Sequence, residues 1–319
     1  MDRLNILFLG AGNRFSLFER IASACRLEGV QPRLFSYENS LSVPVAKLAT
    51  IIVGLGWDEP EFKQNLLDTI AKWGINVVVP CMDGATIALS QIASDVQILG
   101  CWPVVISAEL CITFENKQLA EKWFIDHGLQ TPVWKPDSPL PWIIKHIHGF
   151  ASRRQFQVNR LEEFHRLQPR IDLQEYLIQP FIDGPEFTID AYVSRSGEVL
   201  GCVPRRRLHV VDGEVVRSVT ERKEPLIEES TKILNCVDFR GPITIQAIQH
   251  EGEFWFIEIN PRFGGGVILS FEAGADYARL LVREAIGRPV SPVSWREGIL
   301  MTRAYREVFF DGGKYDLHS

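Results

Sequence analysis

Three polar residues towards the end of the chain have the types and spacing of a cation site. Residues 254–259 are apolar or aromatic apart from Glu258, and this pattern predicts a buried strand. Side chains alternate along a strand, so Glu258 and Asn260 point to one face and Arg262 follows on the same side. A carboxylate and an amide oxygen held side by side suit a hard cation such as Mg²⁺. Glycines 264–266 then allow backbone N–H groups to approach an anion.

The same pattern also has a purely structural explanation. A buried Glu258 satisfied by Arg262, followed by a turn of glycines, would give the same sequence. The choice between the two explanations therefore depends on the rest of the chain.

Composition limits the classes of protein that fit. The 319 residues are enough for two domains, and 46% hydrophobic with 23% charged residues is typical of a globular protein. A net charge of −6 argues against a nucleic-acid partner, which usually requires a basic stripe. The six cysteines include no C-x-x-C pair, as is typical of reduced cytosolic thiols. The apolar run at residues 6–9 is too short for a signal peptide, and no run approaches the ~20 residues that span a bilayer, so we expect a cytoplasmic protein with no membrane partner.

Short apolar runs alternate with helical patterns through the first hundred residues. A helix is expected after Arg14, and its buried side carries Phe15, Phe18, Ile21, Ala22 and Cys25. Strands are predicted at residues 4–9, 34–35, 50–53, 75–79 and 103–107. Strands that alternate with helices imply a parallel sheet joined by right-handed crossovers. We therefore expect an α/β, Rossmann-like domain over residues 1–108.

The turn after the first strand invites comparison with dinucleotide-binding sites. Gly10 and Gly12 supply two fingerprint glycines, but Phe15 stands where a small residue would allow close helix packing. Glu38, the acid that ends the next strand, comes later than the usual interval of ~20 residues. An NAD site is therefore disfavoured. Asp83 follows the fourth strand at the edge where ligands collect, and an N-cap role is favoured for it over ligand binding.

After residue 108 the pattern becomes mostly antiparallel. A helix opens near residues 113–117 and ends at Gly128, with Leu119, Ala120, Trp123 and Phe124 on its buried side. Strands are predicted at residues 142–145, 175–182, 186–193, 199–203, 243–248 and 254–259, of which the last two form a hairpin. An α+β region thus follows the α/β domain.

In this order the segments resemble the ATP-grasp superfamily, in particular ligases like the carbamoyl-phosphate synthase large subunit. The matching blocks are Glu115-Asn-Lys117, Trp142-Ile-Ile-Lys145, Ile178-Gln-Pro-Phe-Ile-Asp-Gly-Pro-Glu186, Gly241-Pro-Ile-Thr-Ile-Gln246 and Phe256-Ile-Glu-Ile-Asn-Pro-Arg262. The resemblance implies a Rossmann-like pre-ATP-grasp domain over residues 1–108, followed by an ATP-grasp fold over residues 109–319. The ATP-grasp fold would contain two α+β subdomains, at residues 116–182 and 183–310.

The resemblance also assigns a nucleotide site. Lys117 and Lys145 correspond to the cations on the phosphates, and point charges suit a polyphosphate. At the hinge, the carbonyl of Pro180 and the N–H of Ile182 would read adenine, and Glu186 corresponds to the carboxylate on the ribose hydroxyls. The implied nucleotide-binding residues are Lys117, Lys145, Gln179, Pro180, Phe181, Ile182 and Glu186.

A metal site and a set of catalytic cations follow from the same resemblance. Glu258 and Asn260 correspond to Mg²⁺ ligands, joined by Gln246 from the neighbouring strand, and Arg262 to the arginine over the transferring phosphoryl group. The cofactors implied are ATP and Mg²⁺, with Mn²⁺ as an alternative ion. The catalytic residues expected are Arg262, Lys145, Arg205 and Arg207.

Two of those cations come from the run Arg205-Arg-Arg207, which follows a predicted strand. At least one of the three is expected to face the cleft, because a guanidinium pairs bidentately with a carboxylate or a phosphate. A run of three arginines is also common on a solvated edge.

Gln246 provides a geometric check on the metal site. A plain two-residue turn at Glu251-Gly252 would place Gln246 opposite Ile257, on the wrong face for sharing a ligand with Glu258. Shared ligation therefore predicts an odd-length loop or a bulge, which Gly252 could supply.

Two segments depart from the family pattern. Pro180 stands where the family usually has a glutamate, so a carbonyl remains for adenine but a side-chain contact is lost. The loop from His146 to Arg154 is poor in glycine and serine, and its Arg153 and Arg154 either contact phosphate or are solvated. His146 and His148 have the spacing of a metal pair, but without a third ligand they are expected to be loop histidines.

The predicted activity is that of an ATP-dependent ligase. A carboxylate is first phosphorylated by ATP, and an amine or a thiol then attacks the acyl phosphate, with glycines 264–266 holding its oxygens. Carbamoyl phosphate synthesis itself is not expected, because the chain has no second ATP-grasp half. A kinase on the same fold and a non-catalytic ATP-binding sensor are the alternatives. The expected partners are a small-molecule carboxylate and amine of unspecified identity, and a homodimer is left open.

Overall fold

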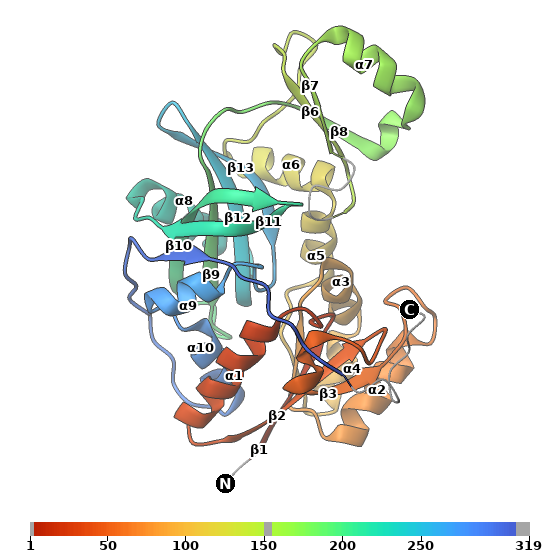
Figure 1. The fold of residues 1–319 in the computed structure, drawn as a ribbon, viewed down its shortest axis with the longest axis vertical. Helices are drawn as coiled ribbons and strands as arrows, with labels where there is room; N and C mark the ends of the chain where they lie inside the picture. The colour runs from red at the N-terminus through yellow and green to blue at the C-terminus, as the bar shows by residue number, and fades with distance from the viewer. Residues whose placement is uncertain (1–2, 150–154, 311–319) are drawn as a thin grey trace.

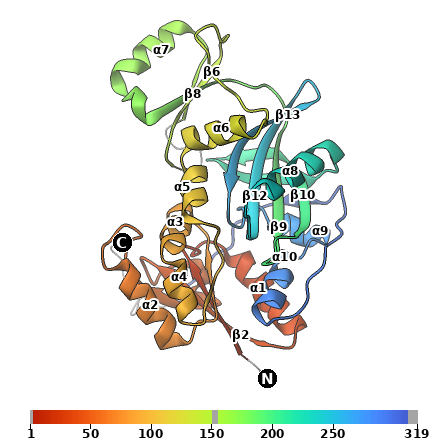
Figure 2. The same cartoon turned by 180° about the vertical axis from the view of Figure 1, so that it is seen from behind.

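The computed structural model describes residues 3–149 and 155–310 and contains three β-sheets. The three sheets follow one another along the long axis of the molecule: the first sheet lies at one end, the largest sheet in the middle and a small sheet at the other end (Figure 1). The view from behind shows that α5 and α6 join the first sheet to the other two (Figure 2). Within the described residues, no helix combines the length and apolar character needed to cross a bilayer.

The first sheet is parallel and has the strand order β3-β2-β1-β4-β5. Helix α1 covers one face and α2, α3 and α4 cover the other, each through buried apolar side chains. Its elements are β1 (Arg3–Leu9), α1 (Phe15–Leu27), β2 (Gln31–Glu38), the 3₁₀ turn η1 (Pro44–Lys47), β3 (Thr50–Val53), α2 (Phe62–Trp73), β4 (Val77–Pro80), α3 (Asp83–Gln91), α4 (Ala93–Ile98) and β5 (Trp102–Pro103).

The predicted elements of this sheet are present, with different bounds. Strand β2 is much longer than the predicted residues 34–35, and the last strand covers only Trp102–Pro103 instead of residues 103–107. The buried side of α1 carries Phe18, Ile21 and Cys25 as predicted, but Leu17 and Ala24 take the places expected for Phe15 and Ala22.

The largest sheet has the order β13-β12-β9-β10-β11-β14, with every pair antiparallel. One face packs on α5, α6 and α8 through apolar residues such as Ile189, Ile245 and Ile259. The alternate positions carry polar side chains, among them Asp190 and Thr244, towards the other face. Its elements, with the helices that pack on it, are α5 (Ala108–Glu115), α6 (Lys117–Asp126), β9 (Glu186–Val193), β10 (Val199–Val211), β11 (Glu214–Thr220), α8 (Glu224–Cys236), β12 (Gly241–His250), β13 (Glu253–Asn260), α9 (Ile268–Ala273), α10 (Tyr277–Ala285) and β14 (Leu300–Thr302).

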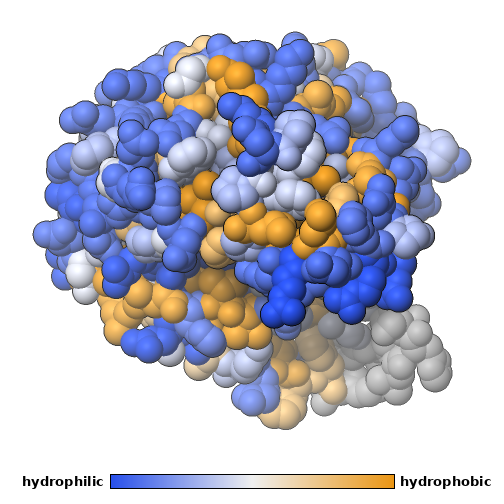
Figure 3. All heavy atoms as spheres, turned by 90° about the horizontal axis from the view of Figure 1, so that it is seen from above, coloured by the Kyte–Doolittle hydropathy of each residue, from blue (hydrophilic) through white to orange (hydrophobic). Residues whose placement is uncertain are grey.

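The small sheet forms a lobe of its own, with the order β7-β6-β8. Its core is small and largely aromatic, and includes Trp142, Ile144 and Tyr176. Seen from this end, hydrophilic residues cover much of the surface and apolar residues form patches between them (Figure 3). The elements are β6 (Trp142–His146), β7 (Gln155–Val158), α7 (Leu161–Leu167), the 3₁₀ turns η2 (Gln168–Arg170) and η3 (Leu173–Glu175), and β8 (Tyr176–Pro180).

A buried carboxylate fixes the first sheet against the C-terminal helices. Glu28, at the end of α1, is 2% exposed and accepts hydrogen bonds from Arg279 (2.5 Å), Arg288 (2.7 Å) and Arg283 (3.2 Å). Burial alone would raise the pKa of this carboxyl, but the three guanidiniums outweigh burial and hold the pKa at about 2. The position of α1 relative to α10, and with it the cleft between the sheets, is therefore fixed by charge as well as by packing.

Candidate active site

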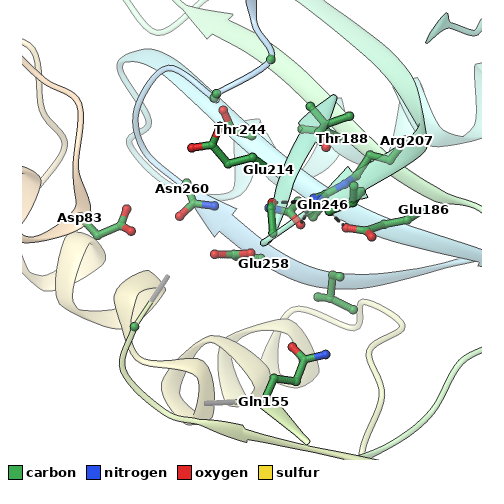
Figure 4. Close-up of a pocket in the computed structure, with 18 of the residues that line it drawn as sticks. Asp83, Gln155, Glu186, Thr188, Arg207, Glu214, Thr244, Gln246, Glu258 and Asn260 are labelled. Carbon is green, nitrogen blue, oxygen red and sulfur yellow. Dashed lines mark hydrogen bonds and ion pairs between the residues drawn. The ribbon is translucent and has the colours of Figure 1, made fainter. Parts of the chain in front are cut away.

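One cavity of about 710 Å³ lies where the three sheets meet. This volume is within the range of ~300–1,000 Å³ that is usual for small-molecule sites. Residues from opposite sides of the cavity face one another, with Gln155 from the small lobe across from Glu258 and Asn260 of the largest sheet (Figure 4). Every residue that the sequence assigned to the nucleotide, the metal or the chemistry lines this cavity: Lys117, Lys145, Gln179, Pro180, Phe181, Ile182, Glu186, Arg205, Arg207, Gln246, Glu258, Asn260 and Arg262.

The β12–β13 hairpin brings Gln246 opposite Glu258. Its turn is the two-residue Glu251-Gly252, with φ values of 50° and 89°. The predicted bulge is present, but it lies at Ile257 instead of at Gly252, because Ala247 pairs with Phe256 and Gln246 with Glu258. Both turn residues adopt left-handed conformations, which close a regular two-residue hairpin and leave the extra residue within the strand. Figure 4 shows Gln246, Glu258 and Asn260 as near neighbours.

The oxygens of these three side chains fit a magnesium ion that also binds phosphates. No hydrogen bond or ion pair joins the side chain of Glu258 to another described residue. Oε1 of Gln246 accepts from Arg207 (3.1 Å), and Oδ1 of Asn260 accepts from Arg262 (3.3 Å), so both amides are oriented. Among the described residues, no three His, Cys, Asp or Glu side chains gather into a cluster. One carboxylate with amide oxygens matches Mg²⁺, which keeps most of its ligands as water and phosphate.

Two lysines face the same part of the cavity. The ammonium of Lys117 donates to the carbonyl oxygen of Gly149 (2.9 Å). The side chain of Lys145 makes no hydrogen bond or ion pair with any described residue. Burial lowers the pKa of its ammonium group to about 8. Glu258 opposes this fall in pKa, and the charge of Lys117 adds to it. Two ammonium groups that line one cavity would both be stabilised by a bound polyphosphate.

The hinge strand β8 is fixed by its own side chain. Gln179 is 4% exposed, and its Nε2 donates to Oε2 of Glu121 (2.6 Å) and to the carbonyl of Pro132 (2.8 Å). The amide of Phe181 donates to the carbonyl of Pro141 (2.9 Å). Gln179 therefore holds the strand in place, while the backbone that follows it lines the cavity.

Two of the three consecutive arginines face the cavity. Arg207 pairs with Glu186 (2.9 Å) and also donates to the carbonyl of Gly213 (3.0 Å). Burial raises the pKa of the Glu186 carboxyl, and Arg207 opposes that effect. Arg205 lies buried beneath the glycines and lines the cavity, whereas Arg206 points to Glu221 at 3.5 Å and does not.

Arg262 is paired with Asp83 across the cleft. Its Nε and Nη2 donate to the two carboxylate oxygens at 2.6 and 3.0 Å. Burial would lower the pKa of Arg262, but the charge and hydrogen bonds of Asp83, together with Glu258 and Cys81, outweigh burial and raise it. The interpretation of Asp83 as an N-cap is wrong: Met82 occupies that position, and Asp83 begins α3 with its carboxylate on the guanidinium. A bidentate charge-assisted pair is stronger than a single bond to a backbone N–H.

Part of the chain is similar in sequence to known proteins. Residues 172–306 match the family described as "ATP-grasp in the biosynthetic pathway with Ter operon". The carbamoyl phosphate synthase large chain of Caldanaerobacter subterraneus subsp. tengcongensis is 28% identical over 169 residues, which cover 46% of this chain and 16% of that protein.

Solved structures show the fold over nearly the whole chain. The biotin carboxylase domain of Hydrogenobacter thermophilus 2-oxoglutarate carboxylase, solved with ADP, magnesium and bicarbonate, superposes with a TM-score of 0.73 at 15% identity, covering 92% of this chain and 73% of that one. The L-amino acid ligase of Bacillus licheniformis gives 0.67 at 16% identity, covering 91% and 76%. The chain therefore has an ATP-grasp fold. The predicted fold class, a Rossmann-like sheet followed by an ATP-grasp fold, is thereby confirmed.

The cavity also contains residues that the sequence did not single out as site residues. Glu38, at the end of β2, accepts from the N–H of Ala11 (2.8 Å) and from the hydroxyl of Ser36 (2.5 Å), and burial raises its pKa. Its carboxylate thus occupies donors of the turn that a dinucleotide pyrophosphate would use. Arg14, Glu214 and Arg303 line the same cavity. Among Glu38, Arg14, Glu214 and Arg303, only Glu38 was indicated by the sequence, because it ends a strand at the carboxyl edge of the sheet.

The loop histidines contact each other and a neighbouring helix. Nδ1 of His146 contacts the carbonyl of His148 (2.8 Å), and Nδ1 of His148 contacts Glu115 (2.7 Å). Arg153 and Arg154 lie outside the described residues.

Proposed function

We propose that this protein is an ADP-forming, ATP-dependent ligase that activates a carboxylate as an acyl phosphate for attack by an amine or a thiol. The observation that carries the proposal is a single cavity lined by Glu258, Lys145, the glycine turn and Arg262, in which the side chains of Glu258 and Lys145 have no hydrogen-bond or ion-pair partner among the described residues. A carbamoyl phosphate synthase and an L-amino acid ligase are among the proteins similar to this chain. Both names are consistent with the proposed class of reaction.

The nucleotide is placed by charge and by the hinge. Adenine binds between the carbonyl of Pro180 and the N–H of Ile182, and Glu186 accepts from the ribose hydroxyls. Lys117 and Lys145 bind the phosphates, where the ammonium groups gain the counter-charge that the protein does not give them. Gln179 and Phe181 complete the hinge.

Gln246, Glu258 and Asn260 are the residues that would hold Mg²⁺, or Mn²⁺ in its place. When bound, the ion neutralises charge on the phosphates and polarises the transferring group. Arg207 orients the Gln246 oxygen, and Arg262 orients that of Asn260. The protein thereby contributes a half-site that is ordered before the nucleotide arrives.

The chemistry consists of two displacements. A carboxylate oxygen of the acid attacks the γ-phosphorus, a new P–O bond forms, and the bond to the β-phosphate oxygen breaks to release ADP. The amine nitrogen then attacks the acyl carbon, the C–N bond forms, the C–O bond to phosphate breaks, and the amine proton leaves with the phosphate. Arg262 and the N–H groups of glycines 264–266 stabilise the transferring oxygens, and Arg205 supports the glycines from below. Phosphoryl transfer depends on such positioning and charge, and needs no nucleophilic side chain.

Turnover with Mg-ATP tests the proposal. Purified protein is incubated with Mg-ATP and panels of acids and amines, and ADP, phosphate and the condensed product are measured by a coupled assay and mass spectrometry. Amine-dependent release of ADP together with phosphate supports the ligase. ADP release with a stable phosphorylated acid would instead identify a kinase, and Mg-ATP binding without turnover on a broad panel would identify a sensor.

Nucleotide affinity should fall as the pH rises above 8. Burial lowers the pKa of Lys145 from its ordinary value of 10.5 to about 8, so the fraction of neutral amine increases above pH 8. Phosphates bind the ammonium form, so binding above pH 8 takes up a proton and weakens about tenfold per pH unit. Calorimetry of MgADP binding at pH 8.5 in two buffers of different ionisation enthalpy measures that proton.

Lys145→Met should abolish the proton uptake and weaken binding at every pH. Lys232→Met, at an exposed position on α8, is the matched control and should change neither. An affinity that stays constant between pH 7 and 9.5 in the unmodified protein would contradict the assignment of Lys145 to the phosphates.

A further inference from the structure

Four guanidiniums surround the glycine turn, residues 264–266. Arg14 donates to the carbonyl of Gly264 (2.7 Å), and Arg303 donates to that of Gly265. Arg205 lies beneath Gly266, where an added Cβ would come within 2.6 Å of its Nη1. The fourth, Arg262, precedes the turn, and all four line the cavity.

Three of these guanidiniums have a carboxylate partner. Arg205 pairs with Asp190 (2.6 Å), Arg262 with Asp83 (2.6 Å) and Arg303 with Glu214 (2.8 Å). Each pair is close to neutral as a whole.

Arg14 differs from the other three. Its contacts among the described residues are the carbonyls of Phe263 (3.3 Å) and Gly264 (2.7 Å), and no carboxylate of the described chain pairs with it. Glu38, at the end of β2, also lines the cavity, but its carboxylate is engaged by Ala11 and Ser36. A guanidinium has five N–H donors, and the Nε–H of Arg14 makes no hydrogen bond to a described residue.

The surroundings make this unpaired charge unfavourable in the free protein. Burial lowers the pKa of the Arg14 guanidinium, and the charges of Arg262 and Arg303 lower it further, while Glu214 opposes them. A buried cation without a counter-ion is costly, and such groups are typical of ligand sites. The missing charge is therefore one that a ligand brings.

We propose that the acid bound by this protein carries a second anionic group, a carboxylate or a phosphate, which binds Arg14 while the carboxylate to be activated faces Arg262 and the glycine turn. This inference rests on the proposed function and specifies its substrate class. The first sheet thus selects the acid, and the largest sheet performs the transfer.

The test compares matched probes that differ by one anionic group, and the member with two anionic groups is called the dianion. Succinate is compared with butyrate, and phosphoglycolate with glycolate, each by calorimetry and thermal shift with and without MgADP. The dianionic member of at least one pair should bind about tenfold more tightly or better, which is the scale of a charge-assisted hydrogen bond. A difference in affinity between succinate and butyrate identifies the second group as a carboxylate, and one between phosphoglycolate and glycolate identifies it as a phosphate.

Arg14→Gln should remove the preference for the dianion, and Arg14→Lys should retain part of it. Arg20→Gln is the matched control, because Arg20 joins the same helix to Glu272 of α9 outside the cavity, and it should keep the preference. Melting temperatures without ligand show whether each variant is folded.

Each outcome decides one of the two claims. Equal binding of monoanions and dianions overturns the inference and leaves the ligase proposal intact. A preference that survives Arg14→Gln, or a uniform loss of binding to all probes together with a lower melting temperature, makes Arg14 a structural brace and also overturns it. Selective binding of dianions without any stabilisation by MgADP would keep the anion site and remove the ligase.

Discussion

Glu258→Gln should reduce ADP release at least ~100-fold, because it removes the carboxylate from the set that would hold the metal. Glutamine has the same shape, and Glu258 has no partner among the described residues that the change would strand. Turnover should therefore fall while the melting temperature stays within a few degrees. The rate is measured by ADP release at increasing Mg²⁺, which should recover only part of the loss.

Glu253→Gln provides the matched control on the same strand. Glu253 is exposed at the start of β13 and contacts Gln130 at the surface. Its replacement should leave both the rate and the Mg²⁺ dependence unchanged. If Glu258→Gln kept more than a tenth of the activity at low Mg²⁺, the assignment of the metal site would be wrong.

The residues that line the cavity could be predicted because most of them depend on local patterns. Strand alternation places Glu258 and Asn260 on one face, and a bulge was required once Gln246 was to share it. Lys145 is the last but one residue of β6, and alternation places its side chain with that of Ile143 on the face opposite the buried Trp142 and Ile144, towards the cavity. The order of the strands along the chain then limits which strands can pair. The alternation of side chains along a strand does not depend on the details of packing.

The pairings across the cleft could not be predicted in this way. Asp83 and Arg262 are 179 residues apart, and nothing in either segment signals the other. Asp83 satisfied the local rules for an N-cap, and a tertiary ion pair overrode them. The bulge lies at Ile257 instead of Gly252 because the register of the hairpin is set by both flanking strands and the turn together.

The contacts of Arg14 and Arg303 with the glycine turn could not be predicted from the sequence either. They lie near opposite ends of the sequence, and both donate to the glycine turn. Arg303 follows the short strand β14, and Arg306 continues the contact of this segment with α1 by reaching Glu19 at 3.3 Å. Such a convergence is a property of the fold, so only coordinates bring these residues together.

Asp190→Ala should cost ~3–5 kcal/mol of unfolding free energy, the largest stability effect that we expect from a single substitution. Asp190 and Arg205 are each 1% exposed and bonded at 2.6 and 3.1 Å, and Ser270 donates to the same carboxylate at 2.6 Å. Removing the carboxylate leaves a buried guanidinium without its partner. Denaturation by urea, followed by circular dichroism, measures the loss. The surface pair of Arg222 and Glu224 is the control, and Glu224→Ala should cost less than ~1 kcal/mol.

The double variant Asp190→Leu/Arg205→Met separates stability from chemistry. A buried pair replaced by apolar residues of similar volume is often close to neutral, so most of the stability should return. Activity should not return, because Nη1 of Arg205 has no partner in the folded protein and lies against the turn that is proposed to hold the acyl phosphate. Recovery of both stability and rate would mean that the pair only supports the turn. Recovery of stability alone would mean that a guanidinium is retained there, at a cost in folding, for the anion that reacts above it.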